Sequence, residues 1–469
     1  LDATGLVDRG NSGRGIDLQI GSGPTTVGGT DAADRNVISG NGSNGIIIWG
    51  SDNNVIINNF IGTDVTGNAA LGNGADGVAL GGTSASNLIG NVGDGNIISG
   101  NANDGVENDA TGINNLVYYN VIGLGFDVVT PVPNGRHGVV IYDGANNTWV
   151  YQNLIAGNTT SGVVIDGNGN AATTANTIAG NYIGTDLSSN PKPNGSHGVH
   201  IFDGATLNAV GGTPAAYRNV ISGNGVDGIR IEGAATSGNR VENNYIGTNI
   251  AGDAAVASGN NGVFIVGAPN NTIGGATVNH RNVISGNGNN GILLDAATAT
   301  GNTIQGNYVG LNAAGDTAVP NVDEGVDLSD APGNTVGGTS AAERNVISGN
   351  GDIGVLLIGA GTTGNTVSAN YIGVNAAGDA PVANGRSGVY IEQGASSNTI
   401  GGATAGHGNV ISGNVEDGIY VTSVGTTANS VTNNYIGTNA AGDGTVPNGD
   451  RGVQVESGAS GNFVGCLLY

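Results

Sequence analysis

One hexapeptide, Asn-Val-Ile-Ser-Gly-Asn or a close variant, recurs along most of this 469-residue chain. Its copies are about sixty-three residues apart and begin at Asn36, Asn96, Asn153, Asn219, Asn282, Asn345 and Asn409. A fixed period of this length is typical of repeat architectures, in which each unit buries its apolar face only against its neighbours. One continuous repetitive domain is therefore expected.

Each period also contains a second, related block, Asn-Tyr-Ile-Gly-Thr or a variant, so the basic unit is a half-repeat of 28 to 33 residues. Each half-repeat holds three short apolar segments separated by Gly, Asn, Asp and Thr, which are strand and turn signals. The leading asparagines of the half-repeats are Asn54, Asn87, Asn115, Asn147, Asn176, Asn208, Asn239, Asn271, Asn302, Asn334, Asn365, Asn398, Asn429 and Asn462.

Three strands that are too short to bury a face alone gain stability when every half-repeat forms one coil stacked on the last. The sequence therefore predicts an all-β parallel β-helix of about 14 coils, with three short strands per coil, stacked Ile and Val inside and loop insertions that alternate between coils. Residues 1–35 would form the first coil, residues 36–461 the regular part in about seven two-coil repeats, and residues 462–469 an incomplete last coil. The leading asparagines suit tight turns and a ladder of side-chain amides.

These motifs resemble the right-handed parallel β-helix repeats of the pectate-lyase-like superfamily, in particular long bacterial secreted and surface proteins with Asn-Val-Ile-Ser-Gly-Asn and Ile-Gly-Thr-Asn blocks. The resemblance covers the chain from Gly15 onward and implies a single right-handed solenoid. It does not select a function, because similar solenoids serve as lyases, hydrolases, adhesins and structural fibres.

Composition limits the partners. The chain has 36 acidic and 12 basic residues and a net charge of −24, which makes nucleic acid and anionic membranes poor partners. We find no apolar run of the length that spans a bilayer, so membrane insertion is not expected. Cys466 is the single cysteine and forms neither a disulfide framework nor a thiolate metal site. Strong acidity with little lysine and much Asn, Thr and Gly favours an extracellular or cell-surface location.

The loops that follow the Ile-Gly-Thr strands keep one carboxylate each. Carboxylate and amide oxygens at this spacing are calcium ligands, although one carboxylate per loop is a low charge count. The alternative is an Asx-turn, which needs only a short side-chain oxygen. Calcium is thus the candidate ion, and no cofactor is required. The candidate ligands are Asp64, Asp186, Asp253, Asp316, Asp379 and Asp443.

Two further rows have a structural and a saccharide-binding interpretation. The arginines before the Asn-Val-Ile strand would pack their stems on apolar surface and bond loop carbonyls, or would bind an anionic saccharide. The aromatic residues at one position of alternate coils would anchor the inserted loops, or would stack on sugar rings. We favour the structural interpretation of both rows, which consist of Arg35, Arg218, Arg281 and Arg344, and of Phe60, Tyr182, Tyr245, Tyr308, Tyr371 and Tyr435.

No unique catalytic constellation stands out. Acids at the ends of third strands are spread along the repeats, and His137 and His197 share one equivalent loop position. Catalytic residues are therefore not assigned, and a non-enzymatic role is favoured. Because both chain ends lack a cap, the sequence favours an extracellular structural protein that assembles end to end with other copies into a fibre or sheath. The alternative is a glycan-binding or polysaccharide-degrading β-helix, either a lyase or a hydrolase. The dispersed acids are Asp203, Glu232, Asp295, Asp330, Glu392 and Glu456.

Overall fold

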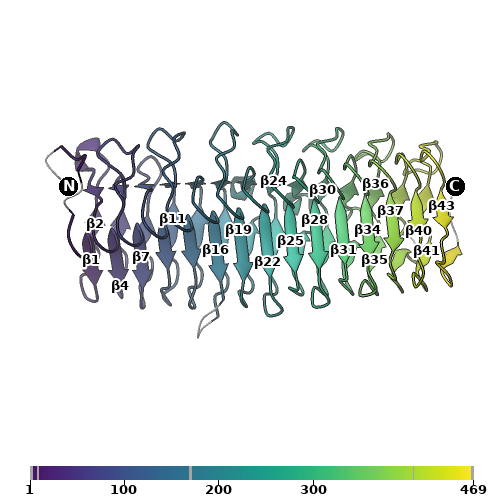
Figure 1. Cartoon of the computed structure of the whole chain (residues 1–469), viewed down its shortest axis with the longest axis horizontal. Helices are drawn as coiled ribbons and strands as arrows, with labels where there is room; N and C mark the ends of the chain where they lie inside the picture. Colours follow the sequence, from purple (N-terminus) through teal and green to yellow (C-terminus); the bar gives the residue numbers. More distant parts are fainter. Residues whose placement is uncertain (1–3, 8–9, 168–171, 405, 466–469) are drawn as a thin grey trace. The chain divides into compact units, whose positions relative to one another are not determined.

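The structure is a computed structural model that describes residues 4–7, 10–167, 172–404 and 406–465. The chain divides into two compact units, residues 1–211 with 216–229, and residues 212–215 with 230–469. In both units the strand order of every sheet advances by three, so each coil adds one strand to each of three parallel sheets, called A, B and C (Figure 1). The predicted all-β right-handed solenoid with three strands per coil is confirmed.

The first unit holds seven strands in each sheet. Sheet A consists of β1 (Ile16–Gln19), β4 (Ile46–Trp49), β7 (Val78–Gly81), β10 (Val106–Asn108), β13 (Val139–Ile141), β16 (Val163–Asp166) and β19 (Val199–Phe202). Sheet B consists of β2 (Thr26–Val27), β5 (Val55–Ile56), β8 (Leu88–Ile89), β11 (Leu116–Tyr118), β14 (Trp149–Tyr151), β17 (Thr177–Ala179) and β20 (Ala209–Gly211). Sheet C consists of β3 (Val37–Ile38), β6 (Phe60–Ile61), β9 (Ile97–Ile98), β12 (Val121–Ile122), β15 (Leu154–Ile155), β18 (Tyr182–Ile183) and β21 (Val220–Ile221).

The second unit repeats this order. Sheet A continues with β22 (Ile229–Glu232), β25 (Val263–Val266), β28 (Ile292–Asp295), β31 (Val326–Ser329), β34 (Val355–Ile358), β37 (Val389–Glu392), β40 (Ile419–Val421) and β43 (Val453–Val455). Sheet B holds β23 (Arg240–Glu242), β26 (Thr272–Gly274), β29 (Thr303–Gln305), β32 (Thr335–Gly337), β35 (Thr366–Ser368), β38 (Thr399–Gly401), β41 (Ser430–Thr432) and β44 (Phe463–Gly465). Sheet C holds β24 (Tyr245–Ile246), β27 (Val283–Ile284), β30 (Tyr308–Val309), β33 (Val346–Ile347), β36 (Tyr371–Ile372), β39 (Val410–Ile411) and β42 (Tyr435–Ile436).

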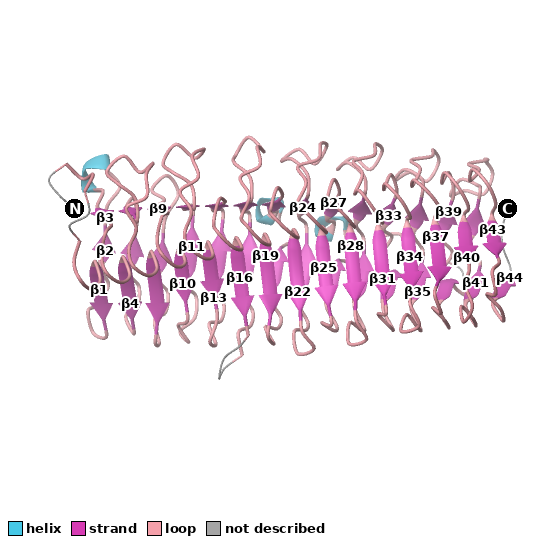
Figure 2. Ribbon diagram, viewed as in Figure 1, coloured by secondary structure: helices cyan, strands magenta, loops and turns pink. Residues whose placement is uncertain are grey.

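The described helical segments are the 3-10 turns η1 (Ala32–Asp34), η2 (Ala215–Tyr217) and η3 (Val278–His280), drawn in cyan in Figure 2. Within the described residues, no helix has the length and apolar character needed to cross a membrane. Cys466 lies outside the described residues. The boundaries predicted after residues 35 and 461 concern the first and last coils, and they stay a prediction.

Alternation along the strands separates a buried face from an outward face. In β25, Val263 and Ile265 are fully buried while Phe264 between them faces outward. Because the strands pair in parallel register, Val263 lies beside Ile292 and Ile265 beside Leu294 of the next coil. Burial of such a side chain contributes about 2 kcal/mol, and the contribution depends on the neighbouring coil being in place.

Buried asparagines link the coils in ladders. In each ladder the side-chain oxygen of one asparagine accepts the backbone N–H and the side-chain amide of the asparagine one coil earlier, as Asn87 does for Asn54 at 2.9 and 2.8 Å. The predicted ladder of leading asparagines is confirmed, with one exception. In the coil of β14 the ladder position is Thr148 in place of Asn147, and the Thr148 N–H donates to Asn176 Oδ1 at 2.9 Å.

The aromatic row lies beneath the inserted loops, as the structural interpretation predicts. Gly315 has a φ of +76°, and a methyl group there would lie 2.7 Å from the ring of Tyr308. An arginine of the arginine row packs on the same ring, since the Arg281 guanidinium lies 4.0 Å from the centre of the Tyr308 ring. Arg281 Nε also donates to the Gly306 carbonyl at 3.2 Å. Both rows therefore hold loops in place.

Candidate active site

The residue two positions before each sheet A strand forms a ladder along this sheet. Asn44 Oδ1 accepts the N–H of Asp76 at 3.3 Å, and Asp76 Oδ1 accepts the N–H of Asp104 at 3.0 Å. The neutral side-chain amides of Asn261 and Asn290 accept the same hydrogen bond from the backbone N–H of the next residue in the ladder. Hydrogen bonding alone therefore does not require the buried carboxyl groups of Asp76 and Asp104.

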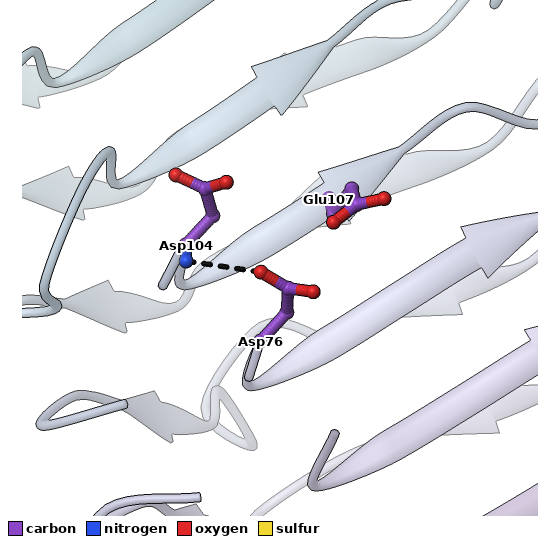
Figure 3. A group of neighbouring side chains, drawn as sticks. All are labelled: Asp76, Asp104 and Glu107. Carbon is purple, nitrogen blue, oxygen red and sulfur yellow. Dashed lines mark hydrogen bonds between the residues drawn. The ribbon is translucent and has the colours of Figure 1, made fainter. Parts of the chain in front are cut away.

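A third carboxyl group joins this pair. Glu107 lies on the outward face of β10, and one oxygen atom from each of Asp76, Asp104 and Glu107 lies within 4.8 Å of the others (Figure 3). The hydroxyl of Tyr142, which follows β13, donates to Glu107 Oε1 at 2.7 Å. Three successive coils thus bring together a buried acid pair, a partly exposed glutamate and a tyrosine.

Burial of these groups changes their protonation. Burial raises the pKa of Asp76 to about 8, and the hydrogen bond and negative charge of Glu107 act in the same direction. Burial also raises the pKa of Asp104. Two contacts act in the opposite direction and lower this pKa, namely the hydrogen bond from the His137 N–H at 2.8 Å and the charge of the Arg136 guanidinium at 3.3 Å. The group therefore retains at least one proton at neutral pH.

Two neighbours complete the environment. Burial, followed by the charge of Glu107, raises the pKa of Asp109 to about 6. Burial and then the charge of Arg136 lower the pKa of His137 to about 4, so its imidazole is neutral at pH 7. Its Nδ1 lies 2.8 Å from Thr160 Oγ1. His137 and His197 hold the same position two residues before their strands, as the sequence predicts.

An exposed tryptophan borders the acid group. Trp49 is 43% exposed at the end of β4 and pairs with Gly81 of β7. A methyl group at Gly81 would lie 2.5 Å from the indole and 2.8 Å from Asp109 Oδ1. The missing side chain therefore lets the indole lie across the sheet next to a carboxyl group whose pKa is near 6.

The raised pKa of Asp76 makes stability depend on pH. The folded chain holds this proton more tightly than the unfolded chain, in which an aspartate titrates near 4. Stability therefore falls as the pH rises from about 4 to about 8 and is level above that range. Asp76→Asn is expected to raise the free energy of unfolding by about 3 kcal/mol at pH 8 and to change it little at pH 4. Urea unfolding at both pH values measures this, with exposed Asp31→Asn as the control. An equal effect of Asp76→Asn at both values would contradict the assignment.

A second acid group lies on sheet A of the second unit. Single oxygens of Asp323, Glu324 and Asp352 lie within 4.8 Å of one another. Burial, then Asp323, raises the pKa of Glu324 to about 8, and burial raises that of Asp327 to about 7. An arginine of the next coil again pairs with the group, since Arg386 lies 3.4 Å from Asp352. This unit therefore also has a group of three acids with an arginine beside it, although Asp323 and Asp352 lie at another position of the coil.

The calcium candidates lie elsewhere, and calcium binding there stays a prediction. In five of the six loops the two polar side chains bond each other, as Asn249 Nδ2 does to Asp253 Oδ1 at 2.7 Å and Asn312 Nδ2 to Asp316 Oδ1 at 2.8 Å. In the loop of Asp186, Asn190 Nδ2 donates to Asp186 Oδ2 at 2.9 Å, and the Asn190 backbone N–H donates to Asp186 Oδ1 at 2.9 Å. These are the Asx-type bonds of the alternative interpretation, in which either residue order places a side-chain oxygen at the turn.

The dispersed third-strand acids do not form a common group. Glu232 accepts from Arg230 at 2.7 Å, and Asp330 accepts the N–H of Gly361 at 2.8 Å. Sequence reasoning did not single out Asp76, Asp104 and Glu107. A signal existed, because two successive coils carry Asp at a ladder position where Asn44 shows that an amide suffices.

Comparisons with known proteins give only low similarities. No family model matches it, and no curated protein matches it. A mutant of the periplasmic alginate epimerase AlgG has 11% identity and a TM-score of 0.44 over 90% of this chain and 74% of its own. The A-module of the Azotobacter vinelandii mannuronan C-5 epimerase AlgE4 has 15% identity and a TM-score of 0.37 over 90% of both chains. The Dettilon tailspike protein has 16% identity and a TM-score of 0.41 over 87% of this chain and 62% of its own.

Proposed function

We propose that the outward face of sheet A in the first unit binds and hydrolyses a polysaccharide. The observation that carries the proposal is the pair formed by Glu107 on β10 and Asp109, which directly follows this strand and whose pKa is raised to about 6. The negative charge of Glu107 contributes to that raised pKa, so the two carboxyl groups are close enough to interact. Glycosidic bond hydrolysis uses two carboxyl groups, one as the acid and one as the base or nucleophile.

The roles follow from the surroundings of each group. Asp109 is partly exposed and is protonated in part near pH 6, so it serves as the general acid that donates to the leaving oxygen. Glu107 serves as the base or nucleophile, with the Tyr142 hydroxyl and protonated Asp76 orienting its carboxyl group. Trp49 supplies an exposed ring on which a sugar can stack.

The charge of the site favours a neutral substrate. Asp76, Asp104, Glu107 and Asp109 bring four carboxyl groups, and Arg136 is the cation paired with them. These negative charges would repel an anionic sugar chain bound at the site, whereas a neutral sugar chain carries no charge to be repelled. A polysaccharide substrate would be encountered outside the cell. This agrees with the extracellular or cell-surface location inferred from composition. End-to-end assembly with other copies stays a prediction.

New reducing ends test the proposal. Xylan, mixed-linkage glucan and galactomannan are compared with polygalacturonate and alginate, each with EDTA and with added calcium. We expect cleavage of at least one neutral polymer that persists in EDTA. Gly81→Ala, which displaces Trp49 and Asp109, is expected to lower kcat/KM about tenfold. Gly13→Ala, where a methyl group meets nothing within 4 Å, is the matched control. Absence of cleavage, or cleavage of anionic polymers alone, would refute the proposal.

A further inference from the structure

The alternation of inserted segments breaks once in the first unit. Seven residues separate β8 from β9, but only two separate β11 from β12, β14 from β15, and β17 from β18. An inserted segment next precedes β21, after β20. The coil of β14 and β15 contains the hexapeptide copy that begins at Asn153. It therefore lacks the inserted segment that precedes the hexapeptide in the other coils of this kind. Four coil steps, about 19 Å, separate the inserted segments on either side.

Aromatic side chains occupy this gap on the outward face of sheet B. Aromatic residues make up only 4% of the chain, yet five of them meet here. The rings of Tyr118 and Tyr151 are parallel with centres 5.3 Å apart, and Tyr119 meets Tyr118 edge-on at 4.7 Å. Trp149 and Tyr217 lie 5.5 Å apart, and Tyr217 lies 5.6 Å from Tyr151. We call these five residues the aromatic surface.

Tyr119 holds a backbone conformation that is strained for an aromatic residue. Tyr119 has a φ of +59° and is 37% exposed. At the same position of other coils, Asn58 and Asn243 have φ values of 54° and 59°, and their amides donate to loop carbonyls at 3.0 and 2.7 Å. Asparagine tolerates this left-handed conformation, whereas a bulky aromatic residue is strained there. Such strain persists where it serves function.

The aromatic surface is uncharged in a chain of net charge −24. Burial and then neighbouring tyrosine hydroxyls raise the pKa of Tyr118 and of Tyr151, so these hydroxyls stay neutral donors at physiological pH. By contrast, Tyr142 in the active site is bonded to a glutamate. Partly exposed rings edged with neutral hydroxyls match the apolar faces and hydroxyl rims of neutral sugars. In the parallel pairing of β11 with β14, Trp149 lies beside Leu116 and Tyr151 lies beside Tyr118. Large side chains at matching positions of successive coils suit a ligand with a repeating structure.

We propose that the aromatic surface is a second binding site for a neutral polysaccharide chain, and that it holds the polymer without taking part in its cleavage. The choice of a neutral polysaccharide rests on the proposed function. The site itself rests on different residues on a different sheet, so the two proposals fail separately.

Affinity electrophoresis in gels containing soluble xylan, mixed-linkage glucan or galactomannan measures binding. We expect retardation by at least one polymer and at least a tenfold weaker Kd for Trp149→Ala/Tyr151→Ala. The same double variant is expected to cleave short soluble oligosaccharides at the parent rate. The chain has two tryptophans, so Trp49→Phe leaves Trp149 as the sole indole, and its fluorescence is expected to change on titration with the retarding polymer.

Tyr119→Asn separates binding from stability. Asparagine is native to this position in other coils, so this variant is expected to have a higher Tm and weaker polymer binding. If the role of Tyr119 were purely structural, the Tyr119→Asn variant would bind the polymer as the parent does. Tyr420→Ala, an aromatic residue of the second unit, is the control and is expected to bind as the parent does.

Several outcomes would overturn the inference. These are an absence of retardation in all three gels, retardation unchanged by the double variant, or concentration-dependent dimers that Trp149→Ala abolishes while no polymer binds. If retardation persists but cleavage is never found, the inference stands and the proposed hydrolysis fails.

Discussion

Replacement of Glu107 with glutamine is expected to lower kcat for polysaccharide hydrolysis about a thousandfold. The amide keeps the shape of the side chain and its hydrogen bond from the Tyr142 hydroxyl, but it neither accepts a proton nor attacks a sugar. Because the change also removes a negative charge beside Asp76 and Asp109, it is expected to lower the pKa of both acids. Because Asp109 is active in its protonated form, the alkaline limb of any remaining pH profile should therefore shift to lower pH.

Glu456→Gln provides a matched control. Glu456 directly follows the sheet A strand β43, and like Glu107 it accepts a hydrogen bond from a tyrosine hydroxyl, that of Tyr420. It is exposed and lies outside both acid groups. Initial rates of reducing-end release at saturating polymer measure kcat for both variants. Equal losses in the two variants, or an unchanged rate in Glu107→Gln, would contradict the roles assigned here.

Asn307→Ala is expected to lower the free energy of unfolding by about 4 kcal/mol, because it leaves several buried groups without partners. Asn307 Nδ2 donates to the Ile273 carbonyl at 2.9 Å and to Asn345 Oδ1 at 3.0 Å. Its Oδ1 accepts the side-chain amide of Asn282 at 2.9 Å. Alanine supplies neither function, and buried polar groups that are left without partners cost free energy.

Urea denaturation followed by circular dichroism measures this loss. Asn279→Ala changes an exposed asparagine of η3 and is expected to alter the free energy of unfolding by less than about 0.5 kcal/mol. A loss at Asn307 as small as that at Asn279 would show that the ladder bonds are replaceable.

The sequence predicts those parts of the fold that every coil repeats. The ladder from Asn54 to Asn87 and the packing of Gly315 on Tyr308 recur at a fixed spacing, so the pattern itself indicates their neighbours. The broken alternation before Asn153 was also readable in principle. It was missed because the hexapeptide there is intact while the residues before it are absent.

The acid group could not be predicted in the same way. Asp76 and Asp104 each look like an ordinary turn residue, and Glu107 like an ordinary outward residue of a strand. Their proximity depends on the exact register of neighbouring coils, and their raised pKa values depend on burial. Neither property is visible one residue at a time. Calcium binding by the loops and end-to-end assembly remain predictions.

The asparagine ladders also have a polarity. In the ladder of leading asparagines the oxygen belongs to the later coil and the N–H to the earlier one, so the Asn54 N–H obtains its partner only when Asn87, 33 residues on, is in place. On the ribosome each finished turn thus exposes donors that the next segment to emerge must satisfy. Synthesis and folding then proceed in the same direction, and a translational pause leaves the newest turn as an open template for other chains.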